Sequence, residues 1–135
     1  MKNDILSPLE QRNELANKIY NYLINNAPGY EKRVKSAMLM QEFNIKDNKT
    51  LRNYIEEIRN NDNYEKIICS ESGNKGGYFA ATNDEEVYLT LEHLYKRSMQ
   101  MLKTYSKIRK KARLDGQYIL KLNEYQKDIY ESIMK

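Results

Sequence analysis

The chain has 135 residues, of which 40% are hydrophobic and 31% are charged, and its formal net charge is +4. This length suits one domain with its own core and an appended arm, and the composition excludes a disordered tail. No apolar run approaches the roughly 18 residues that a membrane span needs, and the first residues lack the apolar stretch of a signal peptide. We therefore expect a cytoplasmic protein with no membrane partner.

The single cysteine, Cys69, and the single histidine, His93, limit the possible chemistry. One thiol cannot close an internal disulfide, and no Cys/His cluster has the spacing of metal ligands. The glycine-rich stretch 73–77 lacks the GxxxxGK[ST] form of a phosphate loop, and no Ser/His/Asp arrangement is evident. Cys69 lies in a short apolar segment, where a cysteine is usually a buried small hydrophobe. We expect no metal, no cofactor and no enzymatic activity.

A helix is expected to begin at Pro8, because Ser7 to Glu10 has the form of a capping box with proline at the first helical position. The apolar pattern that follows ends at the Pro28-Gly29 turn signal, so this helix should end near Asn25. The residues at helical spacing are Leu15, Ala16, Ile19, Tyr22 and Leu23.

Two short helices with a polar turn between them are predicted next, the second over residues 48–61. Ser36 is the expected cap of the first helix, and Asp47 or Asn48 the expected cap of the second. In the second helix Leu51, Ile55 and Ile58 share one face. The opposite, polar face should carry Lys49, Thr50, Arg52, Asn53, Glu56 and Arg59.

A two-stranded hairpin is predicted after this helix pair, because "KIICSES" and "YFAAT" flank the glycine-rich "GNKGG". A long helix should then start at Asn83 or Asp84 and end at Asp115-Gly116, with acids in its first turn and bases near its end. Its apolar positions alternate in steps of four and three, as in a coiled-coil seam. These seam positions are Val87, Leu91, Leu94, Ser98, Met101, Tyr105, Ile108 and Ala112.

A last amphipathic helix is predicted through Leu122, Tyr125, Ile129 and Ile133. It either folds back onto the long helix, or both helices meet a second subunit. The sequence leaves these alternatives open.

The stretch "SAMLMQEFNIKDNKTLRNYIEEIRNN" followed by "KIICSESGNKGGYFAATNDEE" resembles the winged helix-turn-helix domains of small phage and prophage proteins from low-GC Gram-positive bacteria. Its Gly-Tyr step is similar to that of the biotin-repressor type of wing. The resemblance covers about Leu9 to Glu86 and implies DNA binding. It implies that Arg52 and Asn53 match recognition-helix positions, and that Asn74 and Lys75 match the wing tip. The tip departs from strongly DNA-binding wings because it carries one lysine.

The polar face of the second short helix is the first candidate for DNA contact. A helix held by its inner face can lie in the major groove, where arginine suits guanine and asparagine suits adenine. Lys49, Thr50, Arg52 and Asn53 would then read or flank the bases, with Lys35 and Ser36 near a phosphate. The alternative is an ordinary solvated face, which Glu56 and Glu57 favour because carboxylates repel phosphates.

The second candidate is the basic run 96–113, which holds eight lysines and arginines and no acid. Such a helix can lie along phosphates without reading sequence, or its bases can be the solvated faces of a coiled-coil helix. The residues predicted to contact phosphates are Lys107, Arg109, Lys110, Lys111 and Arg113.

The expected fold is mainly α with a small β-hairpin: a winged helix-turn-helix over residues 8–82 and a helical arm over 83–135. The expected function is duplex DNA binding by a homodimer joined through its C-terminal helices, as a phage or prophage transcriptional regulator. The alternative is a phage-encoded protein-interaction module on the same fold, acting in replication or inhibiting a host enzyme or defence complex. One fold hosts many functions, so the fold alone does not separate these.

Overall fold

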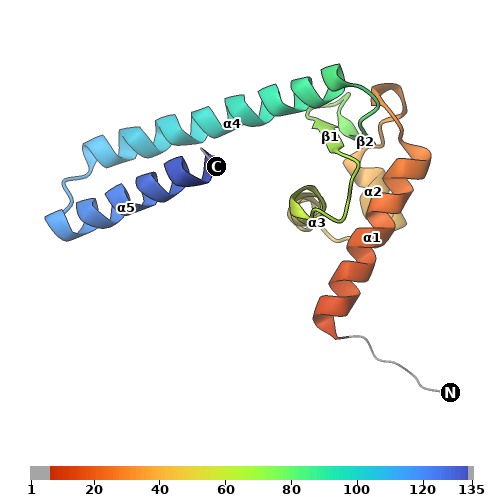
Figure 1. The fold of residues 1–135 in the computed structure, drawn as a ribbon, viewed down its shortest axis with the longest axis horizontal. Helices are drawn as coiled ribbons and strands as arrows, with labels where there is room; N and C mark the ends of the chain where they lie inside the picture. Colours follow the sequence, from red (N-terminus) through yellow and green to blue (C-terminus); the bar gives the residue numbers. More distant parts are fainter. Residues whose placement is uncertain (1–6, 134–135) are drawn as a thin grey trace. The chain divides into compact units, whose positions relative to one another are not determined.

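The computed structural model of the chain describes residues 7–133 and is mainly helical, with one antiparallel hairpin (Figure 1). The predicted order of three helices, two strands and two further helices is confirmed. The elements are α1 (Pro8–Asn26), the 3₁₀ turn η1 (Tyr30–Lys32), α2 (Ser36–Glu42), α3 (Asn48–Asn60), β1 (Ile68–Glu71), β2 (Gly77–Ala80), α4 (Asp84–Lys111) and α5 (Gly116–Ile133).

The chain forms two compact units, one ending at Leu94 and the other beginning at Tyr95. We predicted a boundary at residue 83, where the long helix begins. The first turns of α4 belong to the first unit because Val87 packs against its core and Thr90 is buried.

The first helix begins at the residues that its capping signal predicted. Ser7 Oγ accepts a hydrogen bond from the Glu10 amide at 3.2 Å, and Pro8 occupies the first helical position. The hydroxyl satisfies one of the free amides at a helix start, and proline has no amide to satisfy. At the other end the Ala27 amide donates to the Leu23 carbonyl at 2.9 Å. Local chemistry therefore sets both ends of α1.

The turn between α2 and α3, residues 43–47, is also set by local chemistry. Asn44 adopts the left-handed conformation, with φ of 53°, which asparagine tolerates better than most residues. The Ile45 amide then donates to the Met40 carbonyl at 2.8 Å and closes α2. Asp47 caps α3 by accepting from the Thr50 amide at 2.7 Å, and this backbone hydrogen bond lowers the pKa of the Asp47 carboxyl.

The prediction that Ser36 caps α2 is wrong. Lys35 is the residue before the helix, no side chain caps the helix start, and Ser36 is half-buried at the first helical position. The reason lies one residue earlier, where Val34 pairs with β2 and holds the chain extended through Lys35.

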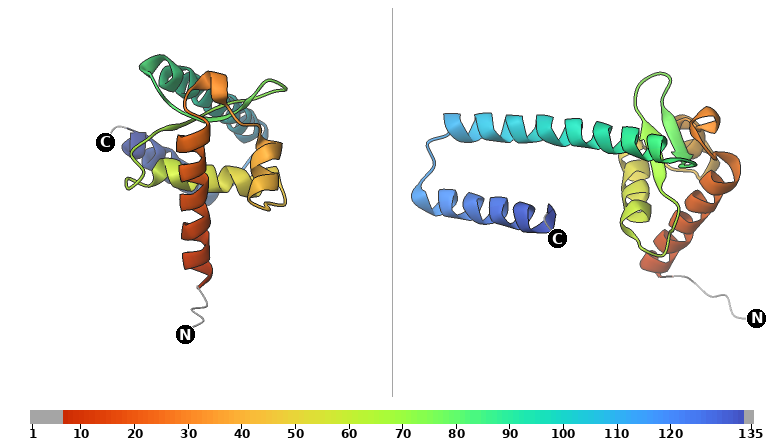
Figure 2. Two further views of the ribbon diagram at one scale, coloured as in Figure 1. Left: turned by 90° about the vertical axis from the view of Figure 1, so that its right-hand side faces the viewer. Right: turned by 45° about the horizontal axis from the view of Figure 1, so that its top comes forward.

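The core of the first unit lies between α1, α2, α3 and the hairpin, with α3 crossing α1 steeply (Figure 2). Leu51, Ile55 and Ile58 are buried on one face of α3, as predicted, and so is Cys69 on β1. Each such aliphatic side chain contributes about 1.5–3 kcal/mol when it leaves water. The largest fully buried side chains are Ile19, Leu23, Leu39, Leu51, Ile55, Ile58, Ile68 and Cys69.

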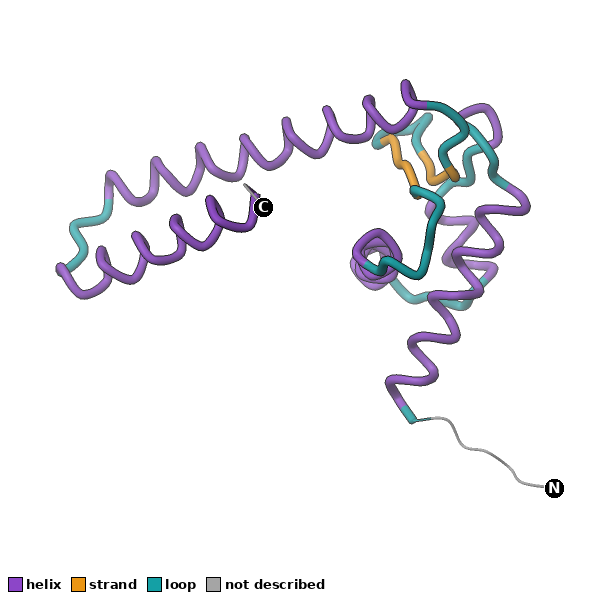
Figure 3. The backbone as a smooth tube through the Cα atoms, in the orientation of Figure 1, coloured by secondary structure: helices purple, strands orange, loops and turns teal. Residues whose placement is uncertain are grey.

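The two strands of the hairpin, orange in Figure 3, are joined through β2, which forms backbone hydrogen bonds along both of its edges. On one edge β1 pairs antiparallel with β2, so that Cys69 faces Phe79. On the other edge Val34 and Tyr78 exchange two backbone hydrogen bonds, each of 2.8 Å. The segment between α1 and α2 therefore forms isolated bridges to β2 at Pro28 and Val34, which we did not predict.

The start of α4 is tied to the first unit through Glu86. Its carboxylate accepts hydrogen bonds from the Tyr30 amide at 2.6 Å, the Thr82 amide at 2.8 Å and the Thr82 hydroxyl at 2.9 Å. Desolvation raises the pKa of the Glu86 carboxyl, but the hydrogen bonds from Thr82 and Tyr30 outweigh it, and the net shift is downward. Asn83 caps the helix by accepting from the Glu86 amide at 2.9 Å, and α4 begins at Asp84, one of the two predicted starts.

The second unit consists of α4 from Tyr95 onward and α5, which runs back along it (Figures 1 and 2). Arg109 joins the two helices by donating to Gln126 Oε1 and to Asn123 Oδ1, each at 2.8 Å. Of the alternatives left open, α5 thus folds back onto the long helix. Yet no described residue from 95 to 133 is buried.

The predicted seam of α4 is only partly covered by α5. Tyr105 and Ala112 are half-buried, whereas Met101 and Ile108 are 69% and 62% exposed. On α5, Tyr125 is 59% exposed, where we predicted a packed residue. The long helix also ends at Lys111, earlier than predicted, and Gly116 opens α5. Two helices alone cannot cover amphipathic faces this broad.

Candidate nucleic-acid interface

The exposed face of α3 carries four of the predicted site residues: Lys49, Thr50, Arg52 and Asn53. The buried Leu51, Ile55 and Ile58 hold the opposite face against the core, so these side chains point away from it. Within residues 7–133, Lys49, Arg52 and Asn53 form no hydrogen bond or salt bridge. Their donors and acceptors are available to a partner, because nothing in the described chain occupies them.

Two residues expected near this face lie elsewhere. Arg59 was predicted on the polar face, but it is half-buried and donates to the Ile68 carbonyl at 2.8 Å and to Ser70 Oγ at 3.0 Å. Burial lowers the pKa of Arg59, and the two acceptors on β1 satisfy part of its guanidinium N–H groups. Arg59 thus connects α3 to the hairpin. A single arginine in a polar stretch of sequence does not indicate such a contact.

Glu57 is the other residue that lies elsewhere. Its carboxylate forms a 2.6 Å salt bridge with Arg12 of α1, whose guanidinium also lies over the Tyr54 ring. We had counted Glu57 against DNA contact, and this pairing neutralises it. Glu56 stays exposed beside Lys49 and Asn53, where it can accept from a cytosine amino group or repel a phosphate.

A second cluster forms at the hairpin tip. Lys35, Asn74 and Lys75, all predicted site residues, line one open cleft of about 360 Å³. Arg33 joins them: it donates to the Lys75 carbonyl at 2.6 Å and stacks over the Tyr30 ring. Ser36, also predicted, does not line this cleft. Three cations and the Glu31 carboxylate therefore surround the opening.

Arg33 was missed by sequence reasoning. Its role depends on the pairing of Val34 with Tyr78, which brings residues 33–35 to the hairpin tip. The tip also needs its glycines, since a Cβ on Gly77 would lie 2.7 Å from the Val34 carbonyl oxygen. The alternation of charged and apolar letters in "KRVK" is too short to signal a strand.

The remaining predicted residues, Lys107, Arg109, Lys110, Lys111 and Arg113, lie in the second unit, at the end of α4 and just beyond it. All but Arg109 are exposed. Arg109 is half-buried and holds α5, as described above, so its guanidinium is already engaged. It also borders a hollow of about 490 Å³ together with Tyr105 and Lys110. The exposed bases of this run can thus contact phosphates. Arg109, in the middle of the predicted set, is already engaged with α5.

The two units carry opposite net charge. Residues 1–94 hold twelve lysines and arginines against fifteen aspartates and glutamates, whereas residues 95–135 hold eleven against four. The first unit is therefore net −3 and the second net +7. Long-range attraction to a polyanion can come only from the second unit, while the first offers specific side chains in an acidic setting.

Within residues 7–133, no three His, Cys, Asp or Glu side chains gather as a metal site would require. In the same range no helix combines the length and the apolarity that a bilayer crossing needs. Comparisons with protein-family models, with curated proteins and with solved structures find no match to this chain.

Proposed function

We propose that this chain is a non-enzymatic duplex DNA-binding protein built on a winged helix-turn-helix, with α3 as the helix that enters the major groove. The observation that carries the proposal is the face of α3 opposite the core. There Lys49, Arg52 and Asn53 are exposed and have no hydrogen-bonding partner among the described residues. An arginine and an asparagine on adjacent positions of such a helix suit guanine and adenine edges.

The arrangement of the first unit supports this proposal. A short extended segment at Val34 lies between α1 and α2 and pairs with β2, and the hairpin follows α3 directly. In helix-turn-helix proteins the helix before the turn buttresses the second helix, which reads the groove. Here α2 and α3 meet at the left-handed Asn44, and Arg59 fixes α3 to β1.

The cleft at the hairpin tip supports a phosphate contact beside the base-reading helix. Arg33, Lys35 and Lys75 converge there from two segments of the chain. Phosphate contacts fix the register of a protein on DNA without reading sequence. Lysines on the exposed side of α4 in the second unit would add further affinity of this kind.

A homodimer through the C-terminal helices belongs to the same proposal, because two α3 helices would contact two half-sites. The resemblance in sequence supports a role as a phage or prophage transcriptional regulator, which would act in the cytoplasm.

A protein-interaction module on the same fold is the second candidate. One observation favours it: the first unit is net acidic, which opposes its approach to DNA. In that case the exposed apolar residues of α4 and α5 would meet a host or phage protein.

The test is fluorescence anisotropy with labelled mixed-sequence duplexes at low and at moderate salt. We expect binding at low salt that weakens as salt rises. The variant Arg52→Ala/Asn53→Ala should bind more weakly at both salt concentrations. Lys18→Ala is the control and should change little: this exposed cation on α1 forms a salt bridge with Glu14 of the same helix. If the wild type binds no duplex even at low salt, DNA binding is excluded and the interaction module takes its place.

A further inference from the structure

We propose that α4 pairs in antiparallel orientation with α4 of a second copy of this chain. The proposed contact runs from Leu91 to Ile108 and has its two-fold axis between Met99 and Gln100. It does not depend on DNA binding.

The first observation is the exposed apolar seam. Leu91 is 59% exposed and Leu94 36% exposed, and Met101 and Ile108 are exposed still further. Met101 and Ile108 stay uncovered because α5 packs on the side of α4 that carries Tyr105 and Arg109. Leu91 and Leu94 precede the unit that holds α5. A row of large apolar side chains along one helix is uncommon on a surface that only water contacts. Burial would stabilise the pair by about 25 cal/mol for each Å² covered.

The second observation is the spacing of the seam. Its steps of four and three residues are the same when α4 is read from either end. Two such helices in opposite directions therefore bring matching positions together around one axis. Leu91 of one copy faces Ile108 of the other, and Leu94 lies opposite Tyr105, which α5 covers in part. The small Ser98 faces Met101 next to the axis, which allows the two helices to approach closely.

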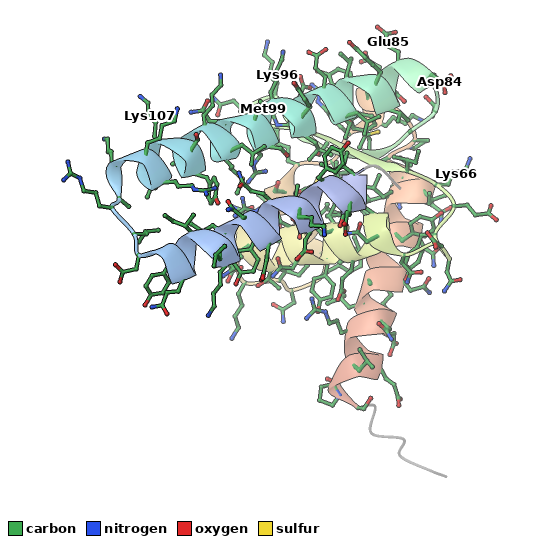
Figure 4. The ribbon with its side chains drawn as sticks, turned by 60° about the vertical axis from the view of Figure 1, so that its left-hand side comes forward. Lys66, Asp84, Glu85, Lys96, Met99 and Lys107 are labelled. Carbon is green, nitrogen blue, oxygen red and sulfur yellow. The ribbon has the colours of Figure 1, made fainter. Side chains whose placement is uncertain are left out.

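The third observation is charge. The start of α4 holds Asp84, Glu85, Glu86 and Glu92 with no lysine or arginine, whereas residues 96–113 hold eight bases and no acid. Figure 4 shows Asp84 and Glu85 at the start of the helix and Lys96 and Lys107 farther along it. In the antiparallel pair the acidic start of each helix lies beside the basic end of the other. A parallel pair would instead place sixteen bases side by side.

This charge pattern also identifies the partner. A partner for this face must present apolar side chains along one stripe together with an acidic stretch at one end and a basic stretch at the other. The same α4 of a second copy presents all three in the reversed order. A nucleic acid supplies the negative charge but no apolar stripe, so it does not match the seam. Opposed helix dipoles add a small favourable contribution.

The test is disulfide cross-linking in a Cys69→Ala background. Leu91→Cys and Ile108→Cys proteins, mixed in a glutathione buffer, should form a covalent heterodimer, and each protein alone should form little dimer. Within one chain the two positions are about 25 Å apart along the helix, too far for a disulfide. Gln100→Cys lies near the axis but on the outer face, and it should not cross-link.

Two results would overturn the proposal. Equal cross-linking of Leu91→Cys alone would mean a parallel pair, and the absence of any covalent dimer in the mixture would mean that no such contact exists. Sedimentation equilibrium provides a readout without cysteines: the wild type should be dimeric and Leu94→Glu monomeric with its helix content retained. A monomeric wild type at every concentration would also overturn the proposal. Neither assay contains DNA, so failure of the proposed function would leave these results unchanged.

Discussion

The unit that ends at Leu94 and the unit that begins at Tyr95 are built from similar amphipathic patterns but are held together differently. In the first, α1, α2, α3 and the hairpin bury one continuous core, and Arg59 and Glu86 connect its edges. In the second, Arg109 bridges the two helices, and no described residue is buried. An apolar stripe therefore shows that a helix needs a covering surface, but not whether its own chain supplies it.

The two units also divide the charge. The first unit is net −3 and the second net +7. In the proposed DNA complex, the first unit would read bases and the second would attract phosphates. A binding protein arranged in this way gains affinity from one part and orientation from the other.

The largest difference in the free energy of unfolding should appear when one leucine of each unit is replaced by alanine. Leu51→Ala removes a fully buried side chain from α3 and should lower the free energy of unfolding by about 2–5 kcal/mol. Leu120→Ala on α5, where the side chain is 66% exposed, should lower it by less than about 1 kcal/mol. Urea denaturation followed by circular dichroism measures both. Equal losses would contradict the difference between the two units.

A smaller effect is expected from glycine-to-alanine changes. Gly77→Ala places a Cβ against the Val34 carbonyl and should destabilise the hairpin by about 1–3 kcal/mol. Gly116→Ala at the start of α5 meets open space and should be neutral or stabilise by up to about 1 kcal/mol. Thermal unfolding of the two variants checks this. A Gly77→Ala protein as stable as the wild type would mean that the pairing of Val34 with β2 is loose.

The charge difference predicts how the response to salt changes. Replacing Lys107, Lys110 and Lys111 by glutamine should reduce the slope of log affinity against log salt by roughly 2–3. The affinity for all duplexes should fall together, because phosphate contacts carry no sequence information.

The matched control for this prediction replaces Lys18, Lys32 and Lys66 of the first unit by glutamine. It removes the same charge, and the slope should stay near that of the wild type. An equal change of slope in both triple variants would assign the attraction to total charge rather than to the second unit.

The smallest effect concerns acid. The pKa of Glu86 is depressed by its hydrogen bonds, so its ionised form stabilises the first unit above the unfolded-state pKa. That stabilisation is lost as the pH falls through the folded-state value. Glu86→Gln should lower the urea midpoint at neutral pH and lose less on acidification than the wild type. The neighbouring Glu85→Gln serves as control, and an identical acid response in both variants would contradict this role of Glu86.

Much of the first unit was predictable because its signals are local. The cap at Ser7, the break before Asp47 and the glycines of the hairpin each act within a few residues. The exposed base-reading candidates Arg52 and Asn53 followed from the same helical pattern. The cluster at the hairpin tip was predicted only in part, because Arg33 arrives there through a pairing between distant residues.

The second unit was harder to predict. The apolar stripe of α4 indicates that the helix needs a covering surface, but not which segment or chain supplies it. The seam of α4 is clear in the sequence, yet α5 covers only the side of Tyr105 and Ala112. Arg109 was predicted as a phosphate contact and instead holds α5. Whether a basic side chain faces solvent or a neighbouring helix depends on tertiary packing, which periodicity does not contain.

The most direct test of base reading by α3 is selection of bound duplexes from a random-sequence pool. The wild type should enrich a recurring motif, and Arg52→Ala/Asn53→Ala should lose that motif. The triple glutamine variant at Lys107, Lys110 and Lys111 should keep the motif at lower affinity. Base reading by α3 would be contradicted if the wild type enriched no motif from the pool. It would also be contradicted if Arg52→Ala/Asn53→Ala enriched the same motif as the wild type.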